Sequence, residues 1–119
     1  MTHSYDKLPL MTVTEAVFHA PGASEVLLAL CRRFHVRRLY LFGSTATGRN
    51  FDPARSDLDF LVAFKPLPPA EYADAYFGLR EALEALSGRP IDLVTEPALE
   101  NPYLRRQVEA ERRLLFQAP

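Results

Sequence analysis

The sequence predicts a small α/β fold, because short apolar runs of strand length alternate with segments that show helical periodicity. Three runs indicate buried strands, at residues 37–42, 58–64 and 90–94. Between and around them, apolar residues recur at steps of three and four, which is the spacing of one helix face. Alternating strands and helices are typical of α/β proteins, although the pattern alone leaves open whether the strands are parallel or mixed.

Length and composition indicate one globular domain with a single modest core. The chain has 119 residues, of which 48% are hydrophobic and 24% charged, and its net charge is −1. A near-neutral charge argues against a dedicated nucleic-acid-binding protein, which normally carries a clear basic excess. Residues 1–22 show no sustained period, so we expect a flexible or weakly ordered N-terminal segment followed by the domain at 23–119.

The first helix is expected to start at Ser24 as its N-cap and to run to about Phe34. Its apolar stripe consists of Val26, Leu27, Leu30, Cys31 and Phe34. Cys31 is the single cysteine, so it cannot form an internal disulfide, and we interpret it as a buried thiol in a reducing compartment. No segment approaches the ~18 apolar residues of a membrane span, so a cytoplasmic protein without membrane contact is expected.

Two further helices follow. Prolines after residue 65 end the second strand and lead into a helix that reaches about Leu86, where Ser87 and Gly88 supply a stop signal. The apolar face of this helix consists of Tyr72, Tyr76, Leu79, Leu83 and Leu86. Asn101 and Pro102 form a helix start, and we expect that helix to continue to about Phe116.

The candidate site lies between the first two strands. An apolar run ends on Gly43 and Ser44, where small residues let backbone N–H groups approach an anion, as in a phosphate-binding turn. Asp57 and Asp59 lie two apart at the start of the second run, so on a strand they point to the same face. The opposite face carries Leu58, Phe60, Val62 and Phe64, and we expect that face to be core.

Two converging carboxylates repel each other unless a cation lies between them. Mg²⁺ is the usual solution, since it binds a few carboxylates together with substrate phosphates. Asp92, in the third apolar run, supplies one more acid. Three acids on two neighbouring strands would hold two metal ions.

The order Gly43-Ser44, Asp57-Leu58-Asp59 and Asp92 resembles the pattern of the DNA polymerase β nucleotidyltransferase superfamily. The short chain is similar to the minimal nucleotidyltransferases (MNT-type, MntA-like antitoxins) encoded beside HEPN toxins. The resemblance implies a mixed sheet and the transfer of AMP from ATP to a hydroxyl, a tyrosine of a HEPN-type toxin. It also implies that Asp57, Asp59 and Asp92 are catalytic and bind two Mg²⁺ ions, while Gly43 and Ser44 bind the nucleotide.

The chain departs from that family at Thr45 and Thr47, where arginines are common. Arg49 is the nearest residue that could replace their phosphate contact. The departure supports one alternative, an inactive antitoxin that blocks its toxin by contact. A small-molecule enzyme of the aminoglycoside-modifying type is a separate alternative, against which the small size of the expected domain argues. The glycine spacing is a poor match to a P-loop, because Arg49-Asn50 stands where the phosphate-binding Lys-Ser or Lys-Thr would be. Acceptor, base preference and oligomeric state do not follow from the sequence.

Overall fold

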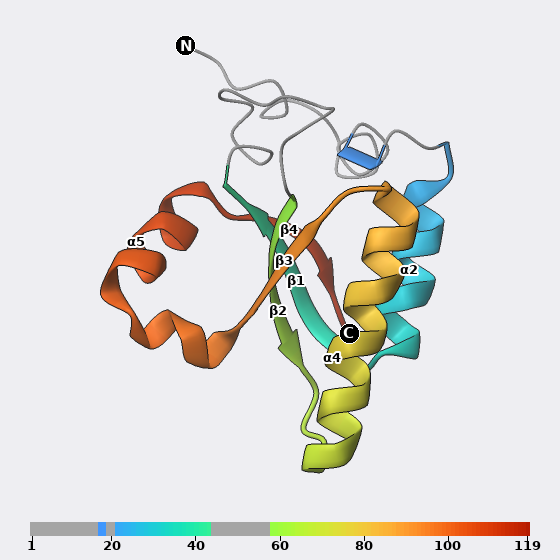
Figure 1. The fold of residues 1–119 in the computed structure, drawn as a ribbon, viewed down its shortest axis with the longest axis horizontal. Helices are drawn as coiled ribbons and strands as arrows, with labels where there is room; N and C mark the ends of the chain where they lie inside the picture. The colour runs from blue at the N-terminus through green and yellow to red at the C-terminus, as the bar shows by residue number, and fades with distance from the viewer. Residues whose placement is uncertain (1–16, 19–20, 44–57) are drawn as a thin grey trace.

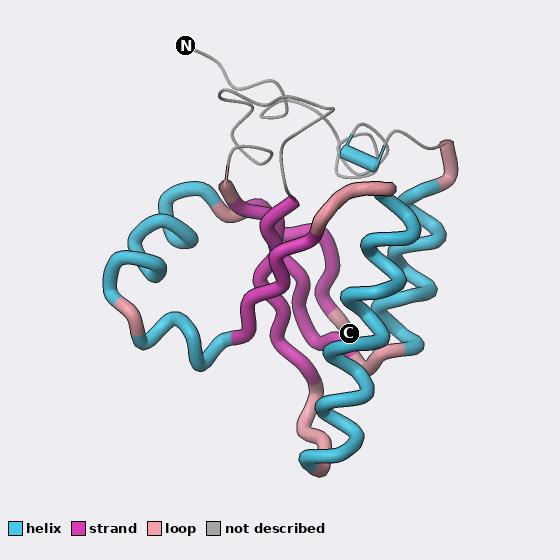
Figure 2. Tube along the Cα trace, in the orientation of Figure 1, coloured by secondary structure: helices cyan, strands magenta, loops and turns pink. Residues whose placement is uncertain are grey.

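The computed structural model describes residues 17–18, 21–43 and 58–119. Its elements, labelled as in Figures 1 and 2, are α2 (Ala23–Arg33), β1 (Val36–Phe42), β2 (Leu58–Phe64), α4 (Pro69–Ser87), β3 (Ile91–Thr95), the 3₁₀ helix η1 (Glu96–Glu100), α5 (Pro102–Glu111) and β4 (Arg113–Gln117). The three expected strands are confirmed to within one residue at each end.

The strands form one mixed sheet in the order β3-β2-β1-β4. β1 pairs antiparallel with both β2 and β4, whereas β2 and β3 are parallel. The mixed sheet confirms the expectation from the resemblance. β1 runs antiparallel to β2, and β2 runs parallel to β3. The C-terminal end of β1 and the N-terminal ends of β2 and β3 therefore lie together, at one end of the strands (Figure 1).

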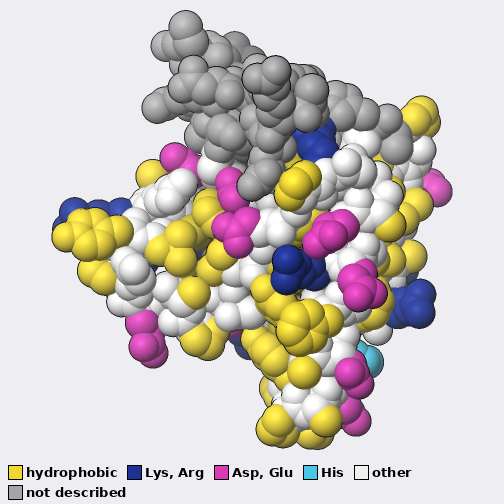
Figure 3. Space-filling view, in the orientation of Figure 1, with side chains coloured by type: hydrophobic (Ala, Val, Ile, Leu, Met, Phe, Trp, Pro, Cys, Tyr) yellow, Lys and Arg dark blue, Asp and Glu magenta, His cyan; other side chains and the backbone are white. Residues whose placement is uncertain are grey.

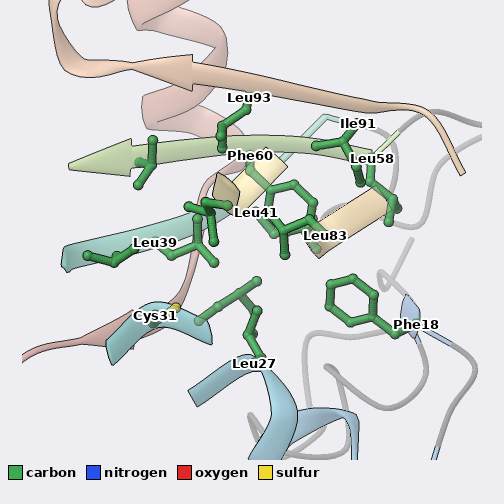
Figure 4. Close-up of a cluster of buried hydrophobic side chains, with 14 of the residues drawn as sticks. Phe18, Leu27, Cys31, Leu39, Leu41, Leu58, Phe60, Leu83, Ile91 and Leu93 are labelled. Atoms are coloured by element: carbon green, nitrogen blue, oxygen red, sulfur yellow. The ribbon is translucent and has the colours of Figure 1, made fainter. Parts of the chain in front are cut away.

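Helices α2 and α4 cover one face of the sheet, where the main core lies (Figure 1). Alternate residues of β2 point into this core, as the period of a strand requires. Its largest fully buried side chains include Phe60, Leu39, Leu41, Leu58, Leu79 and Leu83 (Figure 4 labels most of these). The prediction that Leu58, Phe60, Val62 and Phe64 share a core face is confirmed.

Helix α5 and η1 lie on the opposite face, over a much smaller core. Its fully buried members are Phe42, Leu61 and Val108. Tyr40, Val94, Leu99 and Leu104 pack around them and remain partly exposed. The sheet is therefore thickly covered on one side and thinly covered on the other.

Two predicted helix ends are confirmed. Gly88 ends α4 in the left-handed conformation (φ 67°), and its N–H donates to the Glu84 carbonyl. The side chain of Asn101 accepts hydrogen bonds from the N–H groups of Tyr103 and Leu104, which makes it the N-cap of α5.

Two predicted boundaries are wrong. Ser24 lies inside α2, because the chain enters this helix through Gly22 in the left-handed conformation (φ 78°). The last helix ends at Glu111 instead of continuing to Phe116, and residues 113–117 form the strand β4. The backbone groups of this segment bond to β1, and a pairing with a strand more than seventy residues earlier leaves no trace in the local sequence pattern.

Val17 and Phe18 are buried in the main core, where Phe18 stacks on Phe60 with 6.1 Å between ring centroids. The buried Arg89 side chain donates to the Val17 carbonyl at 2.9 Å and so joins this part of the chain to the start of β3. The domain boundary expected at residue 23 stays a prediction, since residues 1–16 and 19–20 lie outside the described part. Within the described residues, no helix has the length and apolar character of a membrane span.

Candidate active site

The structure describes three of the six candidate site residues. Gly43, Asp59 and Asp92 lie together at the end of the strands where β1 ends and β2 and β3 begin. Ser44, Arg49 and Asp57 lie outside the described residues, so their proposed contacts stay predictions.

Asp59 and Asp92 are direct partners in the parallel ladder of β2 and β3. Partners in register on neighbouring strands point to the same side, about 4.8 Å apart along the hydrogen-bonding direction. Two residues further along, Leu61 and Val94 are also partners, and both belong to the small core under α5. The two acids therefore lie on the same face of the sheet as that core, at the end of the strands where β1 ends and β2 and β3 begin.

The two acids differ in exposure. Asp59 is half-buried and Asp92 is exposed. Asp59 lies between two neighbouring strands, opposite Phe42 of β1 and Asp92 of β3, whereas β3 is an edge strand of the sheet. Asp59 thus belongs to the floor of the site, and Asp92 is accessible from solvent.

Gly43 directly follows β1 and adopts a backbone conformation that residues with side chains rarely adopt (φ 79°). A Cβ at this position would overlap the Oδ2 atom of Asp59 and lie 3.2 Å from its Cγ. Two independent reasons therefore require glycine here: the backbone angle and the close approach of the Asp59 carboxylate.

The backbone N–H of Gly43 donates to Oε2 of Glu111 at 2.9 Å. Glu111 is the last residue of α5 and lies 68 positions further along the chain. Sequence reasoning missed this residue, because one glutamate among the charged residues of an Arg- and Glu-rich helix resembles a solvated surface residue. Only the ladder between β1 and β4, which the sequence did not predict, brings Glu111 to the turn.

Two carboxylates on one face of adjacent strands suit a hard divalent cation. Carboxylate oxygens are the ligands that Mg²⁺ prefers, and two of them on adjacent strands would repel each other without a cation. Among the described residues, no group of three or more His, Cys, Asp or Glu side chains has the arrangement of a metal site. Asp59 and Asp92 therefore fit one side of a magnesium site whose remaining ligands would come from a substrate phosphate, water or Asp57.

The single cysteine plays no part in this site. Cys31 lies fully buried in the main core, on the other side of the sheet, and burial raises the pKa of its thiol to about 12. A thiol with such a pKa stays protonated at neutral pH and is a poor nucleophile. The interpretation of Cys31 as a buried structural residue is confirmed.

The mixed sheet, flanked by three helices in the described part of the chain, has the polymerase β-like nucleotidyltransferase fold. Residues 23–115 match the family described as "Nucleotidyltransferase domain". The chain belongs to this family and is a nucleotidyltransferase.

Relatives with named activities are consistent with this membership. The putative protein adenylyltransferase MJ0128 of Methanocaldococcus jannaschii is 35% identical over 82 residues, which cover 69% of this chain and 79% of the relative. A solved structure of a putative minimal nucleotidyltransferase is 33% identical, with a TM-score of 0.56 over 91% of this chain and 97% of the other. A crystal structure of a toxin–antitoxin with AMP-PNP contains a chain that is 25% identical, with a TM-score of 0.56 over 80% of this chain and 73% of that one.

Proposed function

We propose that this protein transfers AMP from ATP to a hydroxyl group of another protein, a tyrosine of a HEPN-type toxin, and thereby acts as an antitoxin. The relative named as a protein adenylyltransferase supports a protein acceptor. The structural neighbour with AMP-PNP supports an adenine nucleotide and a role in a toxin–antitoxin pair. The single observation that carries the proposal is the pairing of Asp59 with Asp92 beside Gly43.

In this proposal Asp57, Asp59 and Asp92 are catalytic and hold two Mg²⁺ ions. When bound, the ions would lower the pKa of the acceptor hydroxyl and neutralise charge on the leaving group. Asp59, at the floor of the site, would help to orient the triphosphate of ATP. Asp92, exposed at the edge strand, faces the side from which a protein acceptor can approach.

The reaction is an in-line displacement at the α-phosphorus of ATP. The acceptor oxygen forms a bond to that phosphorus, the bond to the oxygen that bridges to the β-phosphorus breaks, and pyrophosphate leaves with the electron pair. The hydroxyl proton passes to the Asp92 carboxylate as general base. The products are an AMP ester of the acceptor and pyrophosphate, so no further reactant is needed.

Phosphate binding is proposed for Gly43, Ser44 and Arg49. Since the Gly43 N–H is bonded to Glu111, its contribution is the close backbone approach that its missing side chain permits. Backbone N–H groups from Ser44 onward would then supply the donors to the β- and γ-phosphates. Arg49 would provide the positive charge that Thr45 and Thr47 cannot.

A protein acceptor also fits the exposed surface of α5. Tyr103 is 80% exposed, and Arg105 and Arg106 are exposed beside it on the same helix. Figure 3 shows hydrophobic and basic side chains together at the left of the molecule, where Figure 1 places α5. Tyrosine and arginine are enriched in protein interfaces, so this surface favours a protein over a small drug as the acceptor.

The test is transfer of label from α-³²P-ATP to the product of the adjacent gene, in the presence of Mg²⁺. We expect labelling by the wild-type protein and a loss of at least about a hundredfold in Asp59→Asn, because a carboxylate that holds the ion is removed. Asp74→Asn is the matched control, since Asp74 is an exposed acid on α4 and should leave transfer unchanged.

Three outcomes would contradict the proposal. A stable complex with the toxin but no label on it would favour an antitoxin that acts by contact alone. Label on an aminoglycoside but not on protein would favour the small-molecule enzyme. Chelation of Mg²⁺ should abolish transfer, and activity that survives an excess of chelator would refute the metal-dependent chemistry.

A further inference from the structure

We infer that Glu111 is a positioning residue of this active site: its carboxylate fixes the end of β1 so that Gly43 and Asp59 stay in contact. The inference deepens the proposed function, on which it rests for the identity of the reaction. It is based on the hydrogen bond that the backbone N–H of Gly43 donates to Glu111 Oε2.

The register of the sheet explains why a side chain makes this bond. In the antiparallel pair of β1 and β4, Leu41 lies opposite Arg113. Continuing that register by two residues places Gly43 opposite Glu111. Glu111 still belongs to α5, so β4 and its ladder with β1 do not extend to this position. The Glu111 carboxylate is the acceptor instead.

The bond satisfies a donor that has little access to water. Gly43 is buried, and a buried backbone N–H without an acceptor is costly. A carboxylate is also a stronger acceptor than a carbonyl because the hydrogen bond is charge-assisted. The Gln107 side chain approaches the same Oε2 atom at 3.5 Å from one turn earlier on α5, so Glu111 has a neighbour that favours its orientation.

Gly43 connects this bond to the reacting groups. Its N–H faces Glu111, while its Cα faces the Asp59 carboxylate so closely that no side chain fits between them. A shift of the end of β1 would therefore change the position of the turn relative to Asp59. Glu111 acts on the chemistry through Gly43, without contact to the nucleotide.

The experiment compares three variants in the labelled-ATP assay. Glu111→Ala removes the acceptor, Glu111→Gln keeps an acceptor oxygen without the charge, and Glu109→Ala alters an exposed neighbour on the same helix. We expect kcat to fall about tenfold to a hundredfold in Glu111→Ala, with a much smaller change in the KM for ATP. Glu111→Gln should restore kcat to within about threefold of wild type, because the hydrogen bond can still form. Glu109→Ala should match the wild type.

A second measurement does not need an active enzyme. Amide hydrogen exchange followed by NMR should show the Gly43 N–H protected in the wild type and in Glu111→Gln, and exchanging at least about tenfold faster in Glu111→Ala. If the wild type transfers no label, the proposed reaction fails while this measurement still decides the role of Glu111.

Three results would overturn the inference. The first is a Glu111→Ala variant with wild-type kcat. The second is a Glu111→Gln variant as impaired as Glu111→Ala, which would show that the charge and not the hydrogen bond matters. The third is faster exchange of the Gly43 amide when AMP-PNP and Mg²⁺ are added, which would mean that the nucleotide displaces the carboxylate.

Discussion

The two faces of the sheet have different roles: one holds the main core and the other holds the candidate site. The face under α2 and α4 holds most of the buried apolar side chains, and the face under α5 holds a small core next to the candidate site. A single strand serves both: Phe60 of β2 points into the main core, while Asp59 before it points to the site. Stability and chemistry can therefore be altered separately, by residues one position apart.

The largest expected effect comes from the same substitution made on each face. Leu39→Ala removes a fully buried side chain from the main core and should cost about 4–5 kcal/mol of unfolding free energy. Leu61→Ala, on the α5 face, should cost only about 2–3 kcal/mol, because the thin layer above it can move into the cavity. Urea denaturation of both variants measures the difference. Equal costs would show that the two faces are packed equally well.

A pair of glycines separates strain in the backbone from damage to the site. Gly22 and Gly43 have nearly the same φ, 78° and 79°, so alanine at either position should cost about 1–2 kcal/mol of stability. An added Cβ meets nothing within 4 Å at Gly22 but overlaps Asp59 at Gly43. Gly43→Ala should therefore also lose about a hundredfold in label transfer, whereas Gly22→Ala should retain it. Similar activity in the two variants would argue against a role for the contact with Asp59.

The smallest effect tests whether the main core is closed to water. Burial raises the pKa of Cys31 from 9.0 to about 12 in the folded protein. Above pH 9 the unfolded chain loses the thiol proton that the folded chain keeps, so the stability from this group is complete below pH 9 and declines towards pH 12. The slope should be up to about 1.4 kcal/mol per pH unit.

Denaturation of the wild type and of Cys31→Ala at pH 8 and pH 10 measures this slope. The extra decline in the wild type should vanish in the variant, while the titration of tyrosines and lysines is common to both. Equal pH dependence would mean that solvent reaches the thiol in the folded state.

The sequence was sufficient for features with a local cause. The strand at 58–64 and the stop at Gly88 follow from periodicity and turn chemistry, and the structure confirms both. The register of β2 and β3 pairs Asp59 with Asp92 on one face of the sheet, while the convergence of all three acids stays a prediction. Asp57, Ser44 and Arg49 stay predictions, since the described residues do not include them.

Features with a distant cause could not be predicted. The segment Leu114-Leu115-Phe116 continues the apolar pattern of α5, so the local pattern predicts a helix. Only its hydrogen bonds to β1 make it a strand. Glu111 depends on the same pairing, because without β4 nothing places the end of α5 beside Gly43. The missed strand β4 and the missed site residue Glu111 therefore have one physical origin. Both depend on a ladder between distant parts of the chain, which no local stretch of sequence contains.

The position of β4 beside β1 has a consequence for biosynthesis. Gly43 and the strands β2 and β3, which carry both described acids, precede α5 and β4 in the chain. They can therefore leave the ribosome before the partner of the Gly43 amide has been made. Contacts between residues this distant in sequence form late in folding. A nascent chain would hold both described acids early but gain the bond between Gly43 and Glu111 only after its C-terminal strand docks, so catalytic competence would report complete folding.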